Sequence, residues 1–263
     1  MSANRTALIT GASSGIGASY ADRLARRGYN LVLVARRSDR LGTLADLLSR
    51  TYGVQAQIQT ADLATTAGCA VVEQLLADNA DINLLVNNAG MGHLGPLAAS
   101  HIDDLTSLIG VNVLALARLS LVALQSFDRR GGGTIINMCS ISAFRAVRNG
   151  AAYGASKAFV LNFTRSLQLE TEGTSVRFQC VMPGPVKTEF LAAAGVDDAL
   201  FPSESFITAD ELVDAALKGL DLGESVTIPT LRDPTSFQTL ADAFTELREE
   251  AGRKGIIAKR YLA

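Results

Sequence analysis

Short apolar runs alternate with longer amphipathic stretches along the whole chain. The runs are almost continuously apolar, as expected for strands that helices cover on both faces. We expect strands at residues 7–10, 31–35, 54–59, 84–87, 134–139, 176–182 and 226–228. We expect helices at residues 15–27, 38–51, 65–79, 103–127, 153–171, 209–220 and 235–250. This alternation predicts an α/β fold with a doubly wound, parallel, seven-stranded sheet.

No linker rich in proline or serine divides the chain, and no repeat is visible, so residues 1–263 are expected to form a single domain. The longest stretch without periodicity is 188–208, which contains Phe190, Phe201 and Phe206. Loops of about 20 residues in compact domains are commonly functional. We expect 188–208 to be a substrate-binding loop; the alternative is a surface excursion, or two short packed helices without a ligand role.

Charge and hydropathy exclude several classes of protein. The chain has 24 Lys and Arg against 26 Asp and Glu, a net charge of −2, and no basic block that would favour nucleic acid. The first ten residues lack the pattern of a signal peptide. The apolar stretch 111–124 is interrupted by Asn112 and Arg118 and is shorter than the roughly 20 residues of a membrane span. We therefore expect a cytoplasmic protein with no membrane span and no nucleic-acid partner.

Cysteine and histidine offer little chemistry. Cys69, Cys139 and Cys180 are far apart, which suggests neither a disulfide framework nor a thiolate zinc site. His93 and His101 match no metal-ligand spacing, so no metal is expected. Any chemistry that the protein carries out must then depend on other side chains.

A glycine-rich turn follows the first expected strand. Residues 11–17 read Gly-Ala-Ser-Ser-Gly-Ile-Gly and lead into a helix. Glycines permit a tight turn and close approach of a ligand, and the start of a helix offers free N–H groups to a pyrophosphate. The turn therefore predicts a dinucleotide site, although an ordinary β-α turn has the same composition.

The same residues also satisfy Gly-x-Ser-x-Gly, the pattern around a hydrolase nucleophile, which would be Ser13. A hydrolase needs an acid and then a histidine downstream, and its nucleophile normally follows several strands. Only His93 and His101 are present, and Ser13 follows the first strand. These departures disfavour a hydrolase.

Basic residues stand where the second expected strand ends. An acid at this point holds the ribose 2′-hydroxyl of NAD, whereas a basic residue suits the 2′-phosphate of NADP. Arg36 and Arg37 occupy the position, and Arg40 follows one helical turn later. A guanidinium can bind a phosphate in a bidentate manner. We expect NADP rather than NAD, with Arg37 assisting Arg36; solvated charge at a helix start is the alternative.

Tyr153 and Lys157 are spaced to lie on one face of a helix. A phenol has a pKa near 10, so it exchanges protons near neutrality only if its anion is stabilised. A neighbouring ammonium group provides that stabilisation. The spacing alone arises often by chance.

Six motifs together resemble the short-chain dehydrogenase/reductase family over about residues 5–230. They are residues 10–17, Asn87-Asn88-Ala89-Gly90, Asn112, Ser140, Tyr153-x-x-x-Lys157 and Pro183-Gly184. The resemblance implies a Rossmann fold in which Tyr153 gives a proton to the substrate carbonyl oxygen. It implies that Ser140 polarises this oxygen, that Lys157 lowers the pKa of Tyr153 and binds the nicotinamide ribose, and that Asn112 anchors a water molecule.

The resemblance also implies a set of residues that contact the coenzyme. They are Gly11, Ser13, Ser14, Gly15, Ile16, Gly17, Arg36, Arg37, Asp62, Leu63, Asn88, Ala89, Gly90, Tyr153, Lys157, Pro183, Gly184, Val186 and Thr188. Val186 and Thr188 are expected near the carboxamide. Asp62 has a second interpretation, as the N-cap of the helix that begins near Thr65.

The positions that choose the substrate in this family are apolar here. They include residues 91–94, Ala143, Phe144, Val147 and the 188–208 loop, which predicts an apolar pocket around a carbonyl group. The leading hypothesis is an NADP-dependent oxidoreductase that reduces a ketone or aldehyde, or oxidises the secondary alcohol. The alternatives are a 3-oxoacyl-thioester reductase of the same family and a dinucleotide-binding sensor or scaffold without activity.

The C-terminal segment combines an amphipathic stretch at 236–250 with an apolar tail at 255–262. Members of the family often form dimers or tetramers. We therefore expect a homodimer or homotetramer, with the tail as an interface or, alternatively, packed within one subunit.

Overall fold

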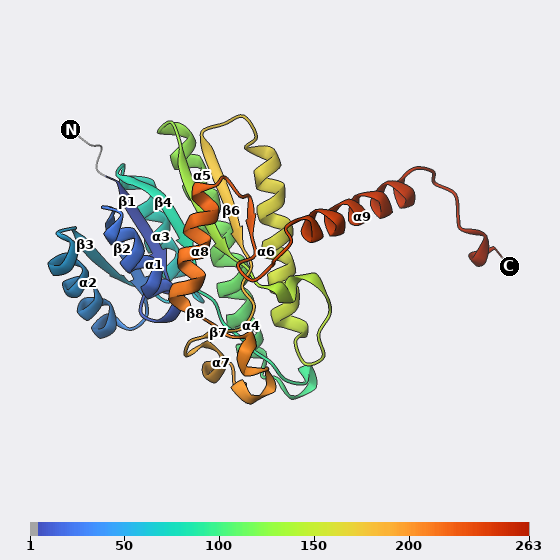
Figure 1. The fold of residues 1–263 in the computed structure, drawn as a ribbon, viewed down its shortest axis with the longest axis horizontal. Coiled ribbons are helices and arrows are strands. Elements are labelled where there is room, and N and C mark those ends of the chain that lie inside the picture. The colour runs from blue at the N-terminus through green and yellow to red at the C-terminus, as the bar shows by residue number, and fades with distance from the viewer. Residues whose placement is uncertain (1–4, 263) are drawn as a thin grey trace. The chain divides into compact units, whose positions relative to one another are not determined.

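A parallel sheet of seven strands forms the centre of the fold (Figure 1). The computed structural model describes residues 5–262. The strands lie in the order β3-β2-β1-β4-β5-β6-β9. Their bounds are β1 Thr6–Thr10, β2 Asn30–Ala35, β3 Ala56–Thr60, β4 Ile82–Asn87, β5 Gly133–Met138, β6 Val176–Val181 and β9 Val226–Thr227. The predicted doubly wound α/β fold is confirmed.

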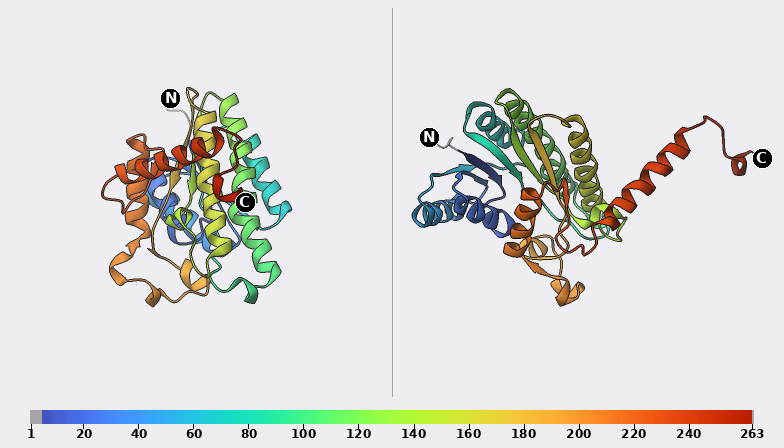
Figure 2. Two further views of the ribbon diagram at one scale, coloured as in Figure 1. Left: turned by 90° about the vertical axis from the view of Figure 1, so that its right-hand side faces the viewer. Right: turned by 45° about the horizontal axis from the view of Figure 1, so that its top comes forward.

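Helices cover both faces of this sheet (Figure 2). Neighbouring residues of one strand belong to opposite cores: Ile9 packs with α1, α2 and α8, whereas Leu8 packs with α3 and α5. Side chains alternate across a strand, so a strand covered on both faces must be apolar at every position. The helices that form the two layers are α1 Gly15–Arg26, α2 Ser38–Tyr52, α3 Thr66–Asp78, α5 Leu116–Arg129, α6 Ala151–Glu170 and α8 Ala209–Asp221.

The strand order reverses between β1 and β4. The chain leaves β1 for β2 on one side, and β4 pairs with β1 on the other, so the connections after β1 and β4 diverge. Ligands of open α/β sheets bind at such a point, beyond the carboxyl ends of the strands. The glycine-rich turn after β1 and the Asn88-Ala89-Gly90 segment after β4 both lie there.

The helix expected over residues 103–127 is not regular throughout. It runs as α4 Ile102–Ile109, a π-helical turn Gly110–Ala115, and α5. Within residues 5–262, Ile102–Arg129 is the one helical stretch whose length and composition would suit a membrane span, and 50% of its most apolar window is buried. Because α5 packs on α3 and on strands β4 and β5, this stretch is a core helix of the α/β layers.

The expected substrate loop has structure of its own. A short parallel pair, β7 Val186–Lys187 and β8 Ile207–Thr208, joins its two ends. Between them lies α7 Phe190–Ala193, followed by two 3-10 turns at residues 198–200 and 203–205. Leu191, Ala194 and Val196 form a small apolar cluster of the loop.

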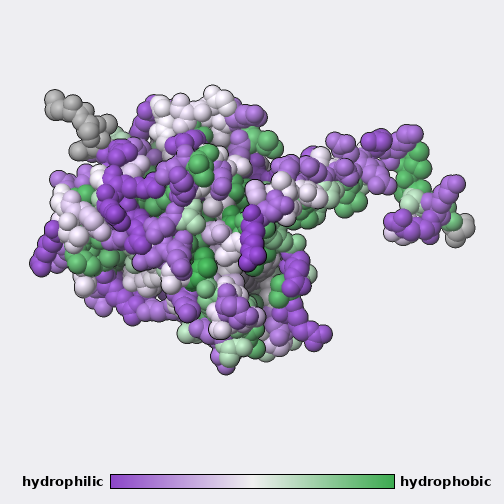
Figure 3. Space-filling model, viewed as in Figure 1, coloured by the Kyte–Doolittle hydropathy of each residue, from purple (hydrophilic) through white to green (hydrophobic). Residues whose placement is uncertain are grey.

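The chain divides into two compact units, Met1–Pro229 and Thr230–Ala263. The sheet and the helices that cover it lie in the first unit, and polar residues cover much of its visible face in Figure 3. That all 263 residues form a single domain stays a prediction.

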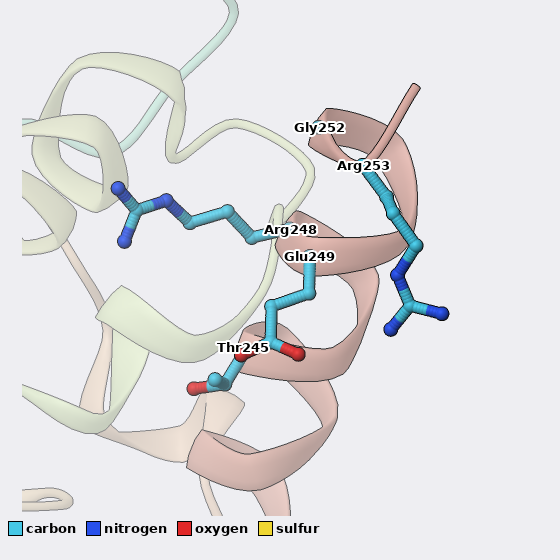
Figure 4. A pocket seen from close by; sticks show the side chains of 5 residues that line it. All are labelled: Thr245, Arg248, Glu249, Gly252 and Arg253. Atoms are coloured by element: carbon cyan, nitrogen blue, oxygen red, sulfur yellow. The ribbon is translucent and has the colours of Figure 1, made fainter.

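The second unit contains helix α9, Thr235–Gly252. Figure 4 shows a pocket lined by residues of α9 and the position after it: Thr245, Arg248, Glu249, Gly252 and Arg253. All five come from successive turns at one helix end, so the hollow is a gap between neighbouring side chains. Phe244, Leu247, Ile256 and Ile257 are exposed in this unit.

Candidate active site

The turn after β1 has the shape of a phosphate cradle. Gly11 and Gly15 have positive φ angles of 68° and 52°. A Cβ atom on Gly17 would lie 2.3 Å from the Gly11 carbonyl oxygen, so no larger residue fits there. Helix α1 begins at Gly15 without a side-chain cap on Ser14, which leaves N–H groups of its first turn available. Free N–H groups at a helix start fit a pyrophosphate.

Asn88 braces this turn from the neighbouring strand. Its side-chain amide donates to the carbonyl oxygens of Thr10 at 2.9 Å and Gly11 at 3.3 Å. The backbone N–H groups of Asn88 and Ala89 both donate to Thr10 Oγ1 at 3.0 Å. The structure thus joins the ends of β1 and β4, and the amide of Asn88 is committed to the turn.

The arginines after β2 lie beside the turn. Arg37 donates to the hydroxyl oxygens of Ser13, at 3.1 and 3.2 Å, and of Ser14, at 2.7 Å. Arg36 is exposed and makes no hydrogen bond or ion pair with another residue of the described chain. Arg40 pairs with Glu189 at 2.8 Å. A free guanidinium beside a braced, hydroxyl-lined turn fits a ribose 2′-phosphate.

Ser140 and Tyr153 meet although they come from different elements. Ser140 follows β5, and its hydroxyl oxygen accepts the N–H of Ser142 at 3.2 Å. Tyr153 lies in the first turn of α6. Burial raises the pKa of Tyr153 to about 12, while a hydrogen bond with the Ser140 side chain opposes the rise. The phenol is therefore protonated at neutral pH.

Lys157 is buried beneath Tyr153, with 5% of its surface exposed. Its Nζ donates to the Met138 carbonyl oxygen at 3.0 Å and lies 5.7 Å from the centre of the Tyr153 ring. Burial lowers the pKa of Lys157, because the charged form loses its hydration. The cation is thus aligned with the phenol, as the helical spacing predicts.

Asn112 lies in the π-helical turn, and this irregularity directs its amide to the segment after β4. The amide nitrogen donates to the Met91 carbonyl oxygen at 2.8 Å, and the amide oxygen accepts the Met91 N–H at 2.8 Å. The nitrogen also donates to Ser156 Oγ at 3.0 Å, and Ser156 Oγ donates to the Tyr153 carbonyl oxygen at 2.7 Å. π-Helical turns frequently occur at functional sites.

Two buried side chains support the site: Ser156, whose role sequence reasoning missed, and Asn87, which belongs to the predicted motif after β4. Ser156 links Asn112 to Tyr153, and its place within the Tyr153-x-x-x-Lys157 motif is the one signal that points to it. Asn87 donates to Ser120 Oγ and to Asn137 Oδ1, both at 3.0 Å, which joins β4, β5 and α5 behind the site. No spacing in the sequence connects these three residues.

Asp62 and Leu63 lie at the end of β3. The Asp62 side chain is exposed, and its carboxylate accepts the N–H of Ala64 at 3.0 Å. The N-cap of α3 is Thr65, whose hydroxyl oxygen accepts the N–H of Gly68 at 3.0 Å. The interpretation of Asp62 as that N-cap is therefore wrong, and its carboxylate keeps one oxygen free. Leu63 is buried.

The segment that begins at Pro183 crosses to the glycine-rich turn. The Pro183 carbonyl oxygen accepts the N–H of Ile141, next to Ser140, at 3.0 Å. A Cβ atom on Gly15 would lie 3.1 Å from Thr188 Cγ2. Gly184 is partly exposed and Val186 is buried. The structure thus brings this segment between Ser140 and the start of α1.

An aromatic side chain of the 188–208 loop packs beside Tyr153. The ring centres of Tyr153 and Phe190 are 5.8 Å apart. A Cβ atom on Gly92 would lie 2.6 Å from Ala194 Cβ and 2.9 Å from Phe190 Cζ. His93 is engaged elsewhere, since its Nε2 shares a hydrogen bond of 2.7 Å with Ser100 Oγ. The 188–208 loop therefore closes on the segment after β4.

Similarity to known proteins agrees with this geometry. A short-chain dehydrogenase from Sphingobium yanoikuyae, solved in complex with NADPH, is 41% identical, with a TM-score of 0.93 over 98% of this chain and 100% of that one. A bulky-bulky ketone specific alcohol dehydrogenase from Comamonas testosteroni is 37% identical, with a TM-score of 0.91 over 100% of both chains. Very-long-chain 3-oxoacyl-CoA reductase-A of Danio rerio is 35% identical over 70% of this chain, and the match spans 58% of that reductase. Residues 5–198 match the short chain dehydrogenase family. The chain therefore belongs to the short-chain dehydrogenase family.

Proposed function

We propose that this oxidoreductase uses NADPH to reduce ketones that carry apolar groups on both sides of the carbonyl, or oxidises the corresponding secondary alcohols. The observation that carries the proposal is the convergence of Ser140 and the buried Lys157 on Tyr153: the Ser140 side chain acts on the phenol, and Lys157 Nζ lies 5.7 Å from the centre of its ring. A proton donor, a hydrogen-bond donor and a cation are thereby gathered next to a phosphate cradle.

When bound, NADPH supplies a hydride to the carbonyl carbon. Negative charge then builds on the carbonyl oxygen, and groups already oriented toward that oxygen lower the barrier. In the proposed reaction the Tyr153 hydroxyl donates its proton to the oxygen, and the Ser140 hydroxyl donates a hydrogen bond to it. Because the pKa of Tyr153 is about 12, the phenol is in the form that can donate.

Lys157 is proposed to stabilise the phenolate that remains and to bind the nicotinamide ribose. Its ammonium group has two N–H groups beyond the one given to the Met138 carbonyl oxygen. Asn112 is proposed to hold the segment around Met91 and, through Ser156, the first turn of α6. The resemblance to the family also implies that Asn112 anchors a water molecule that links Lys157 to solvent.

NADP is favoured over NAD by charge. Arg36 is exposed and free of partners within the described chain, and Arg37 and Arg40 lie close by. No carboxylate follows β2 before Asp39. The Sphingobium yanoikuyae neighbour, solved with NADPH, supports the same choice.

The proposed substrate follows from the apolar surroundings of Tyr153. Phe190 lies next to Tyr153, and both Phe190 and Leu94 pack against the cluster of Leu191, Ala194 and Val196. The Comamonas testosteroni neighbour, which acts on bulky-bulky ketones, supports a ketone flanked by two large groups. A 3-oxoacyl-thioester reductase is not better supported, since that relative is matched over 58% of its length.

Turnover of a substrate panel tests this function. Aryl alkyl ketones with two large substituents, 3-oxoacyl thioesters, steroids and sugars would each be assayed with NADPH and with NADH. The proposal predicts the highest kcat/KM for the bulky ketones with NADPH. Preference for the thioesters would favour the alternative reductase, and preference for NADH would contradict the coenzyme assignment.

Assembly into a homodimer or homotetramer is proposed through the second unit. Phe244, Leu247, Ile256 and Ile257 are exposed there, and contiguous exposed apolar side chains mark interaction sites. Light scattering of the full chain and of the double variant Phe244→Glu, Leu247→Glu tests this. A monomeric wild-type protein would contradict it.

A further inference from the structure

Glu189 connects the coenzyme side of the site to the substrate side. Its carboxylate accepts a hydrogen bond from Arg37 at 3.0 Å and two from Arg40, at 2.8 and 2.9 Å. These partners lie 152 and 149 residues away in the chain. The arginines hold the pKa of Glu189 below its usual value, so the carboxylate is ionised at neutral pH.

The guanidinium of Arg37 that Glu189 engages also contacts the phosphate cradle. Its other N–H groups donate to the hydroxyl oxygens of Ser13 and Ser14. Arg37 therefore faces both the turn and the carboxylate. A phosphate that arrives at Arg36 and Arg37 would meet Glu189 as a competing anion.

The residues on either side of Glu189 contact the catalytic elements. Thr188 lies so close to Gly15 that an added Cβ atom there would be 3.1 Å from it. The Phe190 ring lies 5.8 Å from the Tyr153 ring, centre to centre. Three consecutive residues thus touch the start of α1, the arginine cluster and the acid/base side chain. A shift of Glu189 would move Phe190 relative to Tyr153.

We propose that Glu189 is a positioning residue: the coenzyme 2′-phosphate displaces its carboxylate from Arg37 and Arg40, and this exchange shifts the 188–208 loop and Phe190 beside Tyr153. The inference rests on the proposed use of NADPH. NADH lacks the 2′-phosphate and leaves the pairs of Glu189 intact. The substrate side therefore responds to the identity of the coenzyme.

Exposure makes the exchange possible. The side chains of Arg37, Arg40 and Glu189 are 41%, 44% and 58% exposed, and ion pairs of this kind contribute little to stability. A 2′-phosphate carries up to about two negative charges and binds guanidinium groups in a bidentate manner. It therefore outcompetes a single exposed carboxylate.

Binding of 2′,5′-ADP, which carries the 2′-phosphate, and of ADP, which does not, tests the proposal by calorimetry. The proteins are the wild type, Glu189→Gln and a matched control, Glu204→Gln. Glu204 is exposed on the same loop and makes no ion pair with another described residue. Removing the competing carboxylate is expected to tighten 2′,5′-ADP binding about 2- to 5-fold and to leave ADP binding unchanged. Glu204→Gln is expected to match the wild type.

Hydrogen exchange of residues 189–194 supplies the second readout. In the wild type, 2′,5′-ADP is expected to increase amide exchange there, and ADP is not. In Glu189→Gln the exchange is expected to be high already and insensitive to either ligand. Equal or weaker 2′,5′-ADP binding by Glu189→Gln, or a loop in the wild type that does not respond, would overturn the role of Glu189 and leave NADPH use intact. Failure of the wild type to bind 2′,5′-ADP would overturn both proposals.

Discussion

The Ser140 side chain, which follows β5, faces the phenol of Tyr153 in the first turn of α6. This contact opposes the effect of burial, which raises the pKa of Tyr153 to about 12. In the proposed reaction, both hydroxyl groups act on the substrate carbonyl oxygen.

Ser140→Ala should change the pH dependence of alcohol oxidation. Oxidation needs the Tyr153 phenolate, so its rate rises as pH rises toward the pKa of Tyr153. Since the Ser140 hydrogen bond lowers this pKa, its loss should move the rising limb to higher pH, along with a lower kcat. The measurement is kcat/KM for the alcohol across pH, and a limb that stays in place would show that Ser140 does not act on Tyr153.

Arg36→Ala should weaken the binding of NADPH and leave that of NADH almost unchanged. Loss of a guanidinium that meets a phosphate is expected to raise the KM for NADPH about 10-fold or more, with little change for NADH. Arg50→Ala is the matched control, because Arg50 is also exposed, in α2, and makes no hydrogen bond or ion pair with another side chain within residues 5–262. Equal effects on both coenzymes would exclude Arg36 from phosphate binding.

Gly92→Ala should weaken the binding of bulky ketones without affecting the binding of NADPH. The new Cβ atom would lie 2.6 Å from Ala194 Cβ and 2.9 Å from Phe190 Cζ, so the loop must move away. We expect a KM for bulky ketones raised several-fold with the KM for NADPH unchanged. Gly95→Ala is the control, since a Cβ atom there meets nothing within 4 Å. Similar kinetics of the two variants would mean that the loop does not line the substrate site.

Ser156→Ala should lower stability. The change removes one of the two acceptors of the Asn112 amide nitrogen, and a buried N–H that loses its partner costs about 1–3 kcal/mol. For a chain of this size the Tm should fall by roughly 2–10 °C. Thermal unfolding followed by circular dichroism measures this, and an unchanged Tm would show that the link through Ser156 contributes nothing.

The fold was predictable because the apolar residues of each strand indicate which faces of the strand are buried. Leu8 and Ile9 point to opposite cores, so both are apolar, and the run from Ala7 to Ile9 is typical of a strand covered on both faces. The π-helical turn around Asn112 was not predictable. Asn112 in this turn is hydrogen-bonded to the Met91 backbone, 21 residues away, and local sequence does not encode such a contact.

The site was predictable only where the spacing of residues within one helix brings their side chains together. Tyr153 and Lys157 are one helical turn apart, so their alignment is visible in the sequence. The pair of Arg37 and Glu189 joins exposed residues 152 positions apart, and exposed charges follow no periodic pattern. Only the folded chain brings them together.

The most direct test of the proposed chemistry is ketone reduction by Tyr153→Phe. This change removes one hydroxyl and keeps the ring that packs on Phe190. We predict that kcat for NADPH-dependent reduction falls about 10²- to 10⁴-fold, the range of general acid catalysis, while the Kd for NADPH stays within about twofold of the wild type. Ketone-dependent oxidation of NADPH at the wild-type rate would contradict the assignment of Tyr153 as the proton donor.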